Sequence, residues 1–358
     1  MRVRVLVVNA GSSSLKVRLL GRDDEVEETA DVEPGADLDE LLGAWPRPDA
    51  VGHRVVHGGT RFADPVLVDD DVRKALEELT ALAPLHQPKS LEGLEAVSRL
   101  LPDVPAVACF DTAFHATLPA AAATYAVPEA WRERYAIRRY GFHGLSHAWC
   151  AGRVAERTGA RRIVTAHLGA GASLAAVLDG RSVDTTMGFT PLEGLVMATR
   201  SGTVDPGLVL WLEEHERLSP HEIAETLERR SGLAALAGTA DMREVVERAG
   251  RGEERACLAL DVYVHRLAGG IAAMAAAAGG MEALAFTGGV GERASVVRAR
   301  AARRLEFLGV AVDDARNTVH GGGNGGEITG ADATVRTLVV AAREDLEIAR
   351  GVRAALRR

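Results

Sequence analysis

The chain has 358 residues, of which 47% are hydrophobic and 26% are charged, a composition typical of folded globular proteins. This length favours two domains, and the net charge of −8 argues against nucleic acid as a partner, because a phosphate backbone requires a basic surface. The three cysteines, Cys109, Cys150 and Cys257, are widely spaced and form no CxxC pair, which indicates reduced thiols and not a disulfide framework or a structural zinc site.

The sequence also predicts where the protein works. The apolar stretch at the N-terminus is too short for the hydrophobic region of a signal peptide. No run of apolar residues reaches the roughly 18 that span a membrane, and the alanine-rich stretch 267–278 is shorter than that. We therefore expect a cytoplasmic protein with no membrane partner.

The predicted elements alternate between strands and helices, which is typical of α/β proteins. Residues 4–8 predict an apolar strand that ends in a glycine and serine turn, and residues 15–20 predict a second strand. Further along, Ser219, Pro220 and Glu222 have the spacing of an N-cap, a first-turn proline and a capping-box glutamate.

The C-terminal half adds further helices and a strand. Asp241 predicts the cap of a helix that begins at Met242, and residues 257–278 predict a long buried helix that stops at the following two glycines. Residues 321–326 predict a surface loop. Residues 335–341 predict a buried strand, and a final helix is expected from about Glu344.

A weak internal repeat links the two halves. Residues 5–11 match residues 163–169 in register, each being an apolar strand, a polar residue and a turn that leads to a second strand. A separation of 158 residues suits two similar α/β domains better than a short repeat array. Chance similarity between two strand-turn-strand units is the alternative.

Three glycine-rich turns, at residues 9–16, 167–173 and 286–292, each follow a predicted strand. The first joins two strands and does not open a helix, so it is neither a Walker A loop nor a dinucleotide fingerprint. Its backbone N–H groups, hydroxyls and Lys16 still suit one anion, although a plain hairpin turn has the same pattern. Three such turns together favour nucleotide binding.

A charged set of residues accompanies these turns. Residues 53–57 read as a strand whose alternation places His53, Val55 and His57 on one face and Arg54 and Val56 on the other. An arginine beside a valine suits a small carboxylate with a methyl group, and Asp111 follows an apolar run. Isolated arginines more often form surface ion pairs, however.

Two other classes of site are not expected. The histidine pairs 53/57 and 143/147 lack thiolates and the glutamate of a metalloprotease helix, which argues against zinc. The sequence contains no G-x-S-x-G nucleophile elbow, which argues against a serine hydrolase.

Taken in order, the motifs resemble those of the acetokinase family, the acetate kinases of the actin-like and sugar-kinase superfamily. The resemblance covers essentially the whole chain. Its motifs are NAGSSSLK at 9–16, HRVVHGG at 53–59, APLH at 83–86, FDTAFH at 110–115, YGFHGLSH at 140–147, MGFTPLEGL at 187–195, TRSG at 199–202, DMR at 241–243, the glycine loop at 287–292 and EDL at 344–346.

The resemblance implies an α/β fold of two duplicated ribonuclease-H-like domains, as in actin-like ATPases, around a central cleft. The expected domains are residues 1–113 with 345–358, and residues 114–344. The implied reaction is reversible transfer of the ATP γ-phosphate to acetate, which gives acetyl phosphate and ADP. The resemblance also implies Mg²⁺, with Mn²⁺ as the alternative, and a homodimer; the apolar helix 257–278 could serve as its interface, although a core helix has the same pattern.

The roles that the resemblance implies fall into four groups. The catalytic residues are Asp111, His143 and Arg200. The acceptor-binding residues are Arg54 for the carboxylate and Val56, Leu85, Phe142 and Pro191 for the methyl group. The ATP-contacting residues are Lys16, His167, Leu168, Gly169, Ala170, Gly171, Asp241, Met242, Arg243, Gly289, Val290, Gly291, Glu292 and Arg293. The Mg²⁺-linked residues are Asn9 and Glu344, with Asp345 as the alternative to Glu344.

Chemistry supports this assignment of roles. A carboxylate is already an adequate nucleophile, so the protein needs no activating base and has to align the acceptor with the γ-phosphate and neutralise charge. We therefore expect direct in-line transfer without a phospho-enzyme, with Asp111 positioning the metal ion or an arginine.

Several positions depart from the family pattern, and the chain is some tens of residues shorter than typical members. Ala170 and Arg293 each replace an asparagine in a nucleotide loop, Gln87 replaces a frequent asparagine, and Arg343 replaces a neutral residue. These departures concern nucleotide affinity and the phosphoryl donor, for which polyphosphate and GTP are alternatives.

Three other functions are alternatives to this reaction. A kinase that prefers propionate or butyrate would share the motifs, but Val56 favours acetate because pocket size decides the acid. A nucleotide-binding module without transfer would not need the acceptor-side arginines. Nothing in the sequence indicates the assembly surface of an actin-like filament.

Overall fold

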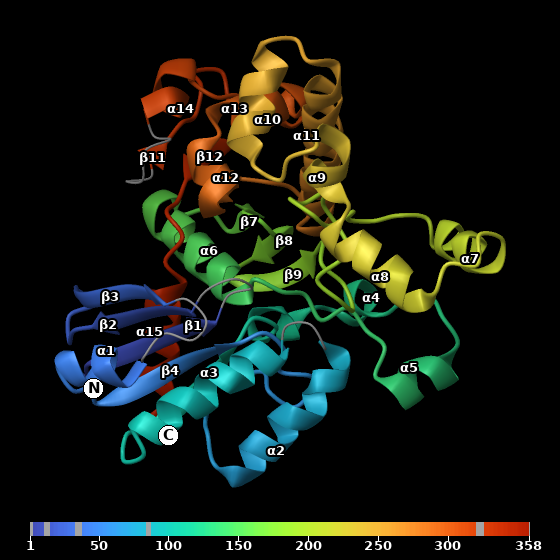
Figure 1. Cartoon of the computed structure of the whole chain (residues 1–358). Helices are drawn as coiled ribbons and strands as arrows, with labels where there is room; N and C mark the ends of the chain where they lie inside the picture. The colour runs from blue at the N-terminus through green and yellow to red at the C-terminus, as the bar shows by residue number, and fades with distance from the viewer. Residues whose placement is uncertain (1–2, 11–14, 33–37, 84–86, 320–325, 358) are drawn as a thin grey trace. The chain divides into compact units, whose positions relative to one another are not determined.

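The computed structural model describes residues 3–10, 15–32, 38–83, 87–319 and 326–357. The chain divides into two compact units (Figure 1). The first unit comprises Met1–Ala116, Phe142–Trp149 and Arg343–Arg358, and the second comprises Thr117–Gly141 and Cys150–Ala342. The domain bounds and the central cleft expected from the sequence remain predictions.

The first unit is built on one mixed sheet. Its strands are β1 (Val5–Ala10), β2 (Leu15–Leu20), β3 (Val26–Val32), β4 (Ala50–Val55), β5 (Val66–Leu67) and β6 (Ala106–Phe110). Their order is β3-β2-β1-β4-β6-β5. The first three form an antiparallel meander, β1, β4 and β6 run parallel, and β5 pairs antiparallel with β6.

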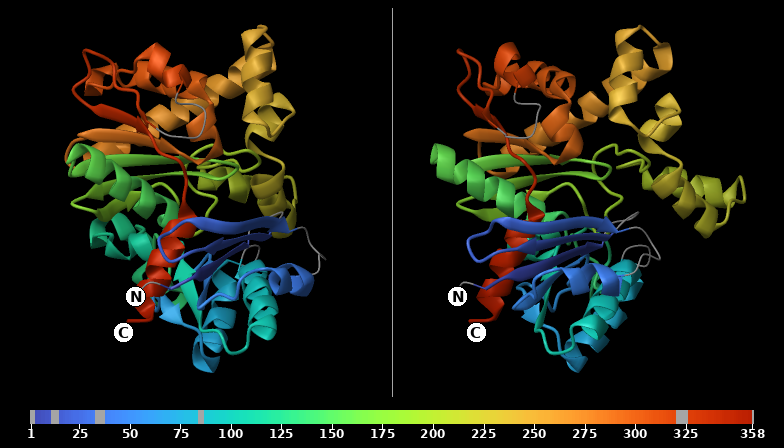
Figure 2. Two further views of the ribbon diagram at one scale, coloured as in Figure 1. Left: turned by 90° about the vertical axis from the view of Figure 1, so that its left-hand side faces the viewer. Right: turned by 60° about the vertical axis from the view of Figure 1, so that its left-hand side comes forward.

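Two helices cover the two faces of this sheet because successive side chains of a strand point to opposite sides. Val5 and Val7 pack with α15 (Glu344–Ala355), whereas Leu6 and Val8 pack on the side of α3 (Gln87–Leu100). Figure 2 shows α15 and α3 on opposite faces of the β1–β4 region. The last helix of the chain is therefore part of the core that contains its first strand.

The remaining helical elements of the first unit are short. They are α1 (Leu38–Ala44), α2 (Asp70–Glu78), η1 (Leu79–Leu82), η2 (Ala113–Thr117) and the first turns of α6 (Gly144–Thr158), which continues into the second unit. Asp69 caps α2 by accepting a hydrogen bond from the Val72 N–H, at 2.8 Å.

The second unit contains the other mixed sheet. Its strands are β7 (Arg162–Leu168), β8 (Ala172–Leu178), β9 (Arg181–Thr185), β10 (Ala283–Thr287), β11 (Gly326–Glu327) and β12 (Arg336–Val339). Their order, read from the meander, is β9-β8-β7-β10-β12-β11. Again the meander is antiparallel, β7, β10 and β12 run parallel, and β11 pairs antiparallel with β12.

The longest helix of the second unit is α11 (Glu254–Ala277), which is long and apolar enough to cross a membrane by length and composition alone. Ten residues of α11 are buried in this unit, as in the core helix of an α/β domain. The others are α4 (Ala120–Ala123), α5 (Glu129–Tyr135), α7 (Pro206–Glu214), α8 (Pro220–Arg229), α9 (Gly232–Ala237), α10 (Met242–Gly250), α12 (Gly288–Arg293), α13 (Ser295–Arg304), η3 (Glu306–Leu308) and α14 (Asp314–Val319).

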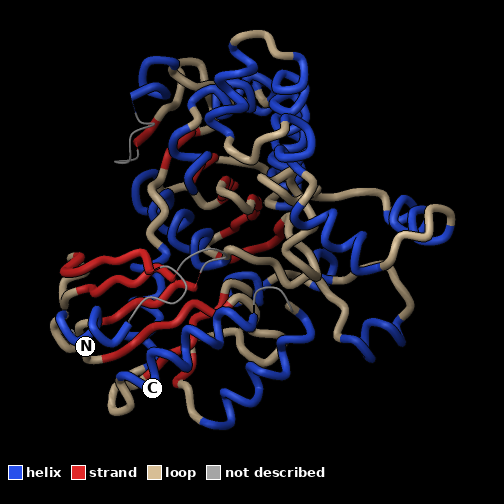
Figure 3. Tube along the Cα trace, viewed as in Figure 1, coloured by secondary structure: helices blue, strands red, loops and turns tan. Residues whose placement is uncertain are grey.

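The two sheets have the same strand order and the same pattern of parallel and antiparallel pairs. Figure 3 colours the strands of both sheets red. β1 corresponds to β7, β4 to β10 and β6 to β12, and even the edge strand precedes its neighbour in the chain in both units. This confirms the duplicated α/β fold that the internal repeat indicated.

Most of the elements predicted from the sequence are present. Ser219 caps α8 through the Glu222 N–H, Asp241 caps α10, and α15 begins at Glu344. The long helix begins at Glu254, three residues before the predicted start. The loop predicted at 321–326 lies almost entirely outside the described residues.

One strand prediction is wrong in its length. The alternation expected through His57 ends at Val55, where β4 stops. Beyond that residue the His57 N–H donates to Gln87 Oε1, at 3.1 Å, in place of a ladder bond. A buried side chain thus terminates the strand just after Arg54.

Candidate active site

Arg54 and Asp111 meet at the ends of two neighbouring parallel strands, β4 and β6. Arg54 Nη2 donates to Asp111 Oδ2 at 2.6 Å, and Arg54 Nε lies 3.1 Å from both carboxylate oxygens. The Asp111 side chain is 2% exposed and the Arg54 side chain 17%. This buried two-point contact fixes the orientation of the guanidinium.

Two residues that are far apart in the sequence extend this pair. Arg54 Nη1 donates to Asn9 Oδ1 at 3.0 Å, and Asn9 Nδ2 donates to Glu344 Oε2 at 3.0 Å. Asn9 lies at the end of β1, and Glu344 is the first residue of α15. The structure therefore brings together four predicted site residues from four separate segments of the first unit.

The charged groups in this cluster shift one another's pKa values. Burial lowers the pKa of Arg54, but the Asp111 carboxylate and then Glu344 outweigh burial and raise that pKa above its ordinary value. Burial raises the pKa of Asp111, Arg54 opposes that shift, and Glu344 adds to it. Arg54 stays a cation throughout, between two carboxyl groups.

Asp345, the alternative metal-linked residue, has other partners. Arg343 donates to its carboxylate at 2.9 Å, and Arg18 Nη1 lies 3.2 Å from Asp345 Oδ2. Burial raises the pKa of Asp345, but these two arginines outweigh burial and hold it below its ordinary value. Arg343, which departs from the family pattern, thus pairs with Asp345 and leaves Glu344 as the carboxyl group beside Asn9.

The start of α6 lies against Asp111. The Gly144 N–H donates to the Asp111 carbonyl oxygen at 2.8 Å, and His143 immediately before it has a left-handed φ of 57°. A non-glycine residue in this region is strained, which is common at functional sites. The structure therefore places His143 next in sequence to a residue bonded to the Asp111 backbone.

The apolar acceptor residues of the first unit are buried close to this cluster. Phe142 is buried, and its ring makes an edge contact with His57, with 5.6 Å between ring centroids. Val56 is buried, and Gln87 Nε2 donates to the His57 carbonyl at 3.2 Å, which fixes the backbone after Val56. Leu85 lies outside the described residues.

In the second unit, the two later glycine loops meet. His167 and Leu168 end β7, the turn to β8 consists of Gly169, Ala170 and Gly171, and α12 begins directly after β10, the parallel neighbour of β7. Gly288 has a φ of 79°, and a Cβ there would lie 2.8 Å from the Leu168 carbonyl oxygen. Glycine at 288 is therefore what allows the two loops to touch.

The backbone donors of the β7–β8 turn are partly used within the protein. The Gly169 N–H donates to the Gly171 carbonyl at 2.9 Å, and the Ala170 carbonyl accepts from the Ala198 N–H at 3.1 Å. The side chain of Ala170 is exposed. The turn is thus tied to the protein by two backbone hydrogen bonds, and the position that carries an asparagine in the family pattern is exposed.

The other predicted ATP contacts are placed as follows. Lys16 is exposed on β2 opposite Asn9, Arg293 is exposed at the end of α12, and Gly289 is exposed in its first turn. Glu292 Oε1 accepts from the Ala342 N–H at 3.0 Å. The remaining members of the set are Val290 and Gly291 in α12, with Asp241, Met242 and Arg243 at the start of α10, where Arg243 pairs with Asp241 at 2.7 Å.

Arg200 and Pro191 are also brought together within the second unit. Arg200 Nη1 donates to the Pro191 carbonyl at 3.3 Å and lies 3.8 Å from Met197 Sδ. Burial lowers the pKa of Arg200, and Glu228 opposes that shift. The arginine is thus partly desolvated, which strengthens its interaction with an anion.

Sequence reasoning missed Arg298, a buried arginine that holds α12 in place. Its Nη1 donates to the carbonyls of Gly291 and Glu292, at 2.8 and 2.9 Å, and its Nε donates to Asn317 Oδ1 at 2.7 Å. The signal was an arginine at the position where the helical period of α13 requires a core residue, between Val297 and Ala301.

The cluster of the first unit offers oxygen ligands for a cation. No group of three or more His, Cys, Asp or Glu side chains that could hold a metal ion occurs among residues 3–10, 15–32, 38–83, 87–319 and 326–357. Asn9, Asp111 and Glu344 nevertheless place two carboxyl groups and an amide against one guanidinium. Mg²⁺ needs only one or two carboxylates because waters and phosphates complete its shell, so these residues fit it.

The duplicated sheets, with a charged cluster at the strand ends of one unit and glycine loops at those of the other, define the class: an α/β protein built on two mixed six-stranded sheets of the same strand order. The model of the acetokinase family matches residues 46–350. The chain belongs to the acetokinase family.

Individual relatives agree with this family. The chain is 44% identical to the acetate kinase of Thermotoga maritima over 97% of both chains. Its structure is similar to that of Porphyromonas gingivalis acetate kinase, with a TM-score of 0.90 and 36% identity over 99% of both chains. It is equally similar to a propionate kinase from Francisella tularensis, with a TM-score of 0.90 and 35% identity over 97% of this chain and 98% of that one.

Proposed function

We propose that this protein catalyses the reversible transfer of the γ-phosphate of ATP to acetate, which gives acetyl phosphate and ADP. The observation that carries the proposal is the position of Arg54, held by Asp111 and Asn9 at the strand ends of the first unit. Its bonds to described residues use three of the five N–H donors of a guanidinium. Two donors remain to bind the carboxylate of the acceptor.

The catalytic roles follow from charge and geometry. Asp111 positions Arg54, and Arg54 orients the acceptor carboxylate, so that one of its oxygens can attack the phosphorus while the bond to ADP breaks. His143 and Arg200 donate hydrogen bonds to the oxygens of the transferred phosphoryl group and neutralise their charge. No proton has to be removed, since the acceptor is already an anion.

Asn9 and Glu344 would hold Mg²⁺, or Mn²⁺ as the alternative. When bound, the ion would neutralise negative charge on the phosphates of ATP. What supports this assignment is the bond that joins Asn9 to Glu344, within the cluster that contains Arg54.

The ATP-binding residues form three groups. Backbone donors of the β7–β8 turn and of α12 would contact the phosphates, Lys16 would add a positive charge, and Asp241–Arg243 would contact the nucleoside. The proximity of the two glycine loops at Gly288 supports this role. Arg293 is exposed beside them, so polyphosphate and GTP are the alternative donors to test.

A propionate- or butyrate-preferring kinase is the second candidate, because the Francisella protein titled a propionate kinase is as similar in structure as the acetate kinase is. Selectivity between acids that differ by one methylene is worth about 1–3 kcal/mol and is therefore partial. The residues that would contact the methyl group of the acid are Val56, Leu85, Phe142 and Pro191.

The biological setting is part of the proposal. We expect the protein to act in the cytoplasm as a homodimer, with acetate, acetyl phosphate, ATP and ADP as its partners and no nucleic acid or membrane. Sedimentation analysis of the purified chain tests the dimer, and a single species with the mass of one chain would contradict it.

The deciding experiment measures acyl phosphate trapped as hydroxamate. The purified protein is supplied with Mg²⁺, one donor (ATP, GTP or polyphosphate) and one acid (acetate, propionate or butyrate). Product from ATP and acetate that falls with acid chain length supports the proposal. Higher kcat/KM with propionate or butyrate would favour the second candidate, and no product with any acid would overturn both.

A further inference from the structure

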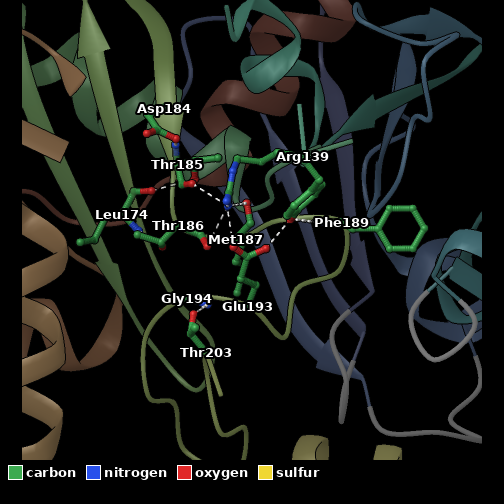
Figure 4. A network of polar contacts seen from close by, with 11 residues as sticks. Arg139, Leu174, Asp184, Thr185, Thr186, Met187, Phe189, Glu193, Gly194 and Thr203 are labelled. Carbon is green, nitrogen blue, oxygen red and sulfur yellow. Dashed lines mark hydrogen bonds and ion pairs between the residues drawn. The ribbon is translucent and has the colours of Figure 1, made fainter. Parts of the chain in front are cut away.

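The loop that follows β9, residues 186–195, carries Pro191 and contacts Arg200, yet it contains no regular secondary structure. One side chain outside the loop, that of Arg139, bonds it at several points. Arg139 Nη1 donates to three consecutive carbonyl groups, and Figure 4 shows its guanidinium directed at the backbone of this loop. The acceptors are Thr185 at 3.1 Å, Thr186 at 3.2 Å and Met187 at 3.2 Å.

The far end of the loop is bound to the same guanidinium. Arg139 Nη2 donates to Glu193 Oε1 at 2.8 Å, so one side chain joins both ends of the loop. Glu193 Oε2 accepts from the hydroxyl of Tyr125. That hydroxyl in turn accepts from the Phe189 N–H at 3.0 Å, in the middle of the loop. Both ends and the middle are therefore held by two side chains from residues 125–139.

The protonation states suit these bonds. Burial lowers the pKa of Arg139, but Glu193 outweighs burial and raises it, so the guanidinium stays charged. Burial and then the Glu193 carboxylate raise the pKa of Tyr125, so its hydroxyl keeps the proton that it donates. The Arg139 side chain is 18% exposed and Glu193 32%, which limits screening by solvent.

Gly188 leaves room for this arrangement. A Cβ at position 188 would overlap the Glu193 carboxylate and the Tyr125 hydroxyl. An alanine there would push these two groups apart without backbone strain, because Gly188 has an ordinary φ. The contacts among Arg139, Glu193 and Tyr125 thus also depend on the absence of a side chain at position 188.

We propose that Arg139, Glu193 and Tyr125 are positioning residues that set the place of Pro191 and, through its carbonyl, the orientation of Arg200, and so control which acid the enzyme accepts. The proposal rests on the proposed function, in which Pro191 contacts the acceptor and Arg200 contacts the transferred phosphoryl group. None of the three residues touches the reacting atoms in this account.

The test compares two tyrosine variants. Tyr125→Phe removes a hydroxyl that makes two hydrogen bonds to the loop, and Tyr263→Phe removes a buried hydroxyl in α11 that has no partner among the described residues. We expect Tyr125→Phe to raise the KM for acetate by about 3- to 10-fold, the equivalent of one hydrogen bond. The KM for ATP should stay unchanged, and the preference for acetate over propionate should fall. Tyr263→Phe should leave all three quantities at wild-type values.

Two further variants test how far the effect on acetate binding depends on this contact. Gly188→Ala should reproduce the Tyr125→Phe phenotype by displacement, and Arg139→Lys should exceed both because an ammonium cannot bond four acceptors at once. Equal falls in kcat/KM for acetate and ATP, in step with a lower melting temperature, would show a merely structural role and overturn the proposal.

Hydrogen exchange separates this proposal from the proposed function. The Phe189 amide and its neighbours in 186–195 should exchange faster in Tyr125→Phe than in wild type or Tyr263→Phe, whatever the substrate. If the wild type phosphorylates no acid, the proposed function falls, and exchange alone then decides. Equal exchange of these amides in all three proteins would overturn the positioning role.

Discussion

The two units have the same strand order but carry different chemistry at equivalent strand ends. In the first unit, β1, β4 and β6 end beside Asn9, Arg54 and Asp111. In the second unit, β7 ends in the β7–β8 turn, and β10 is followed by Gly288. The first unit presents charged side chains, and the second presents backbone with little side chain.

The difference shows how duplication can divide a reaction. The carboxyl ends of parallel strands meet at one edge of a sheet, so the same topology gives each unit one cluster there. Charged side chains orient a small carboxylate, whereas glycines let a large anionic ligand approach the backbone. At equivalent strand ends, the residue types and not the topology therefore decide which kind of ligand each cluster suits.

Removing the charge from the first cluster should have the largest effect. We expect Arg54→Ala to lower kcat/KM for acetate by about 10²–10³-fold, because the acceptor loses its two-point partner. The hydroxamate assay measures this loss. Arg54→Lys should remain impaired, since a point charge does not replace a fork of donors.

Loss of activity in Arg54→Ala has to be distinguished from loss of stability. Arg99→Ala, on the exposed side of α3, should leave kcat/KM unchanged. Because Arg54→Ala leaves Asp111 buried without its partner, the double variant Arg54→Ala/Asp111→Asn should recover melting temperature but not activity. Recovery of activity in the double variant would contradict the acceptor role.

Replacing Gly288, the glycine that follows β10 in the second unit, should have the next largest effect. Gly288→Ala should lower the free energy of unfolding by about 1–3 kcal/mol, from the left-handed φ and the contact with the Leu168 carbonyl. It should also raise the KM for ATP more than that for acetate. Gly289→Ala, where a Cβ meets nothing within 4 Å, should keep the wild-type melting temperature. Equal melting temperatures in the two variants would refute this account.

Three buried histidines of the first unit should make the stability of the protein depend on pH. Burial lowers the pKa of His53 to about 3, and burial lowers those of His57 and His115 to about 4, all in the first unit. The unfolded chain binds protons from about pH 6.5 downward and the folded chain does not, so stability is full above that pH and falls below it. Each histidine contributes up to about 1.4 kcal/mol per pH unit.

The pH prediction is measured by denaturant unfolding between pH 4.5 and 7.5. His53→Leu should reduce the slope of unfolding free energy against pH by one proton. Identical slopes in wild type and His53→Leu would show that His53 is not neutral in the folded state.

The smallest effect concerns Ala170. Restoring an amide with Ala170→Asn should lower the KM for ATP by a few-fold, in line with about 1 kcal/mol for one hydrogen bond. Ala170→Asp provides the control of similar shape and should raise the KM for ATP by charge repulsion. Should both variants bind ATP as the wild type does, the exposed side chain at 170 would not face the phosphates.

Local patterns predicted most of the fold. The caps at Ser219 and Asp241, the strands around residues 5–20 and the repeat at 163–169 depend on neighbouring residues, so the sequence contains their signals. Alternation failed at His57 because Gln87, 30 residues away, ends the strand by a buried hydrogen bond. Such a partner has no signature in a window of adjacent residues.

The candidate site, like the fold, could be predicted from the sequence only in part. Family motifs indicated Asn9, Arg54, Asp111 and Glu344, but only the structure shows that they form one connected cluster. Arg139 and Arg298 were missed because each acts through backbone carbonyls, which any sequence provides. Their burial, and not their residue type, reveals what they do.

The position of α15 has a consequence for synthesis. Asn9 and Glu344 are 335 residues apart, and α15 packs on the strand that contains Asn9. A growing chain folds its domains as they leave the ribosome, usually from the N-terminus. Here the whole second unit is translated before the helix that completes the first. Nascent chains should therefore finish their second unit first, and the Asn9–Glu344 contact should form only when translation has passed residue 344.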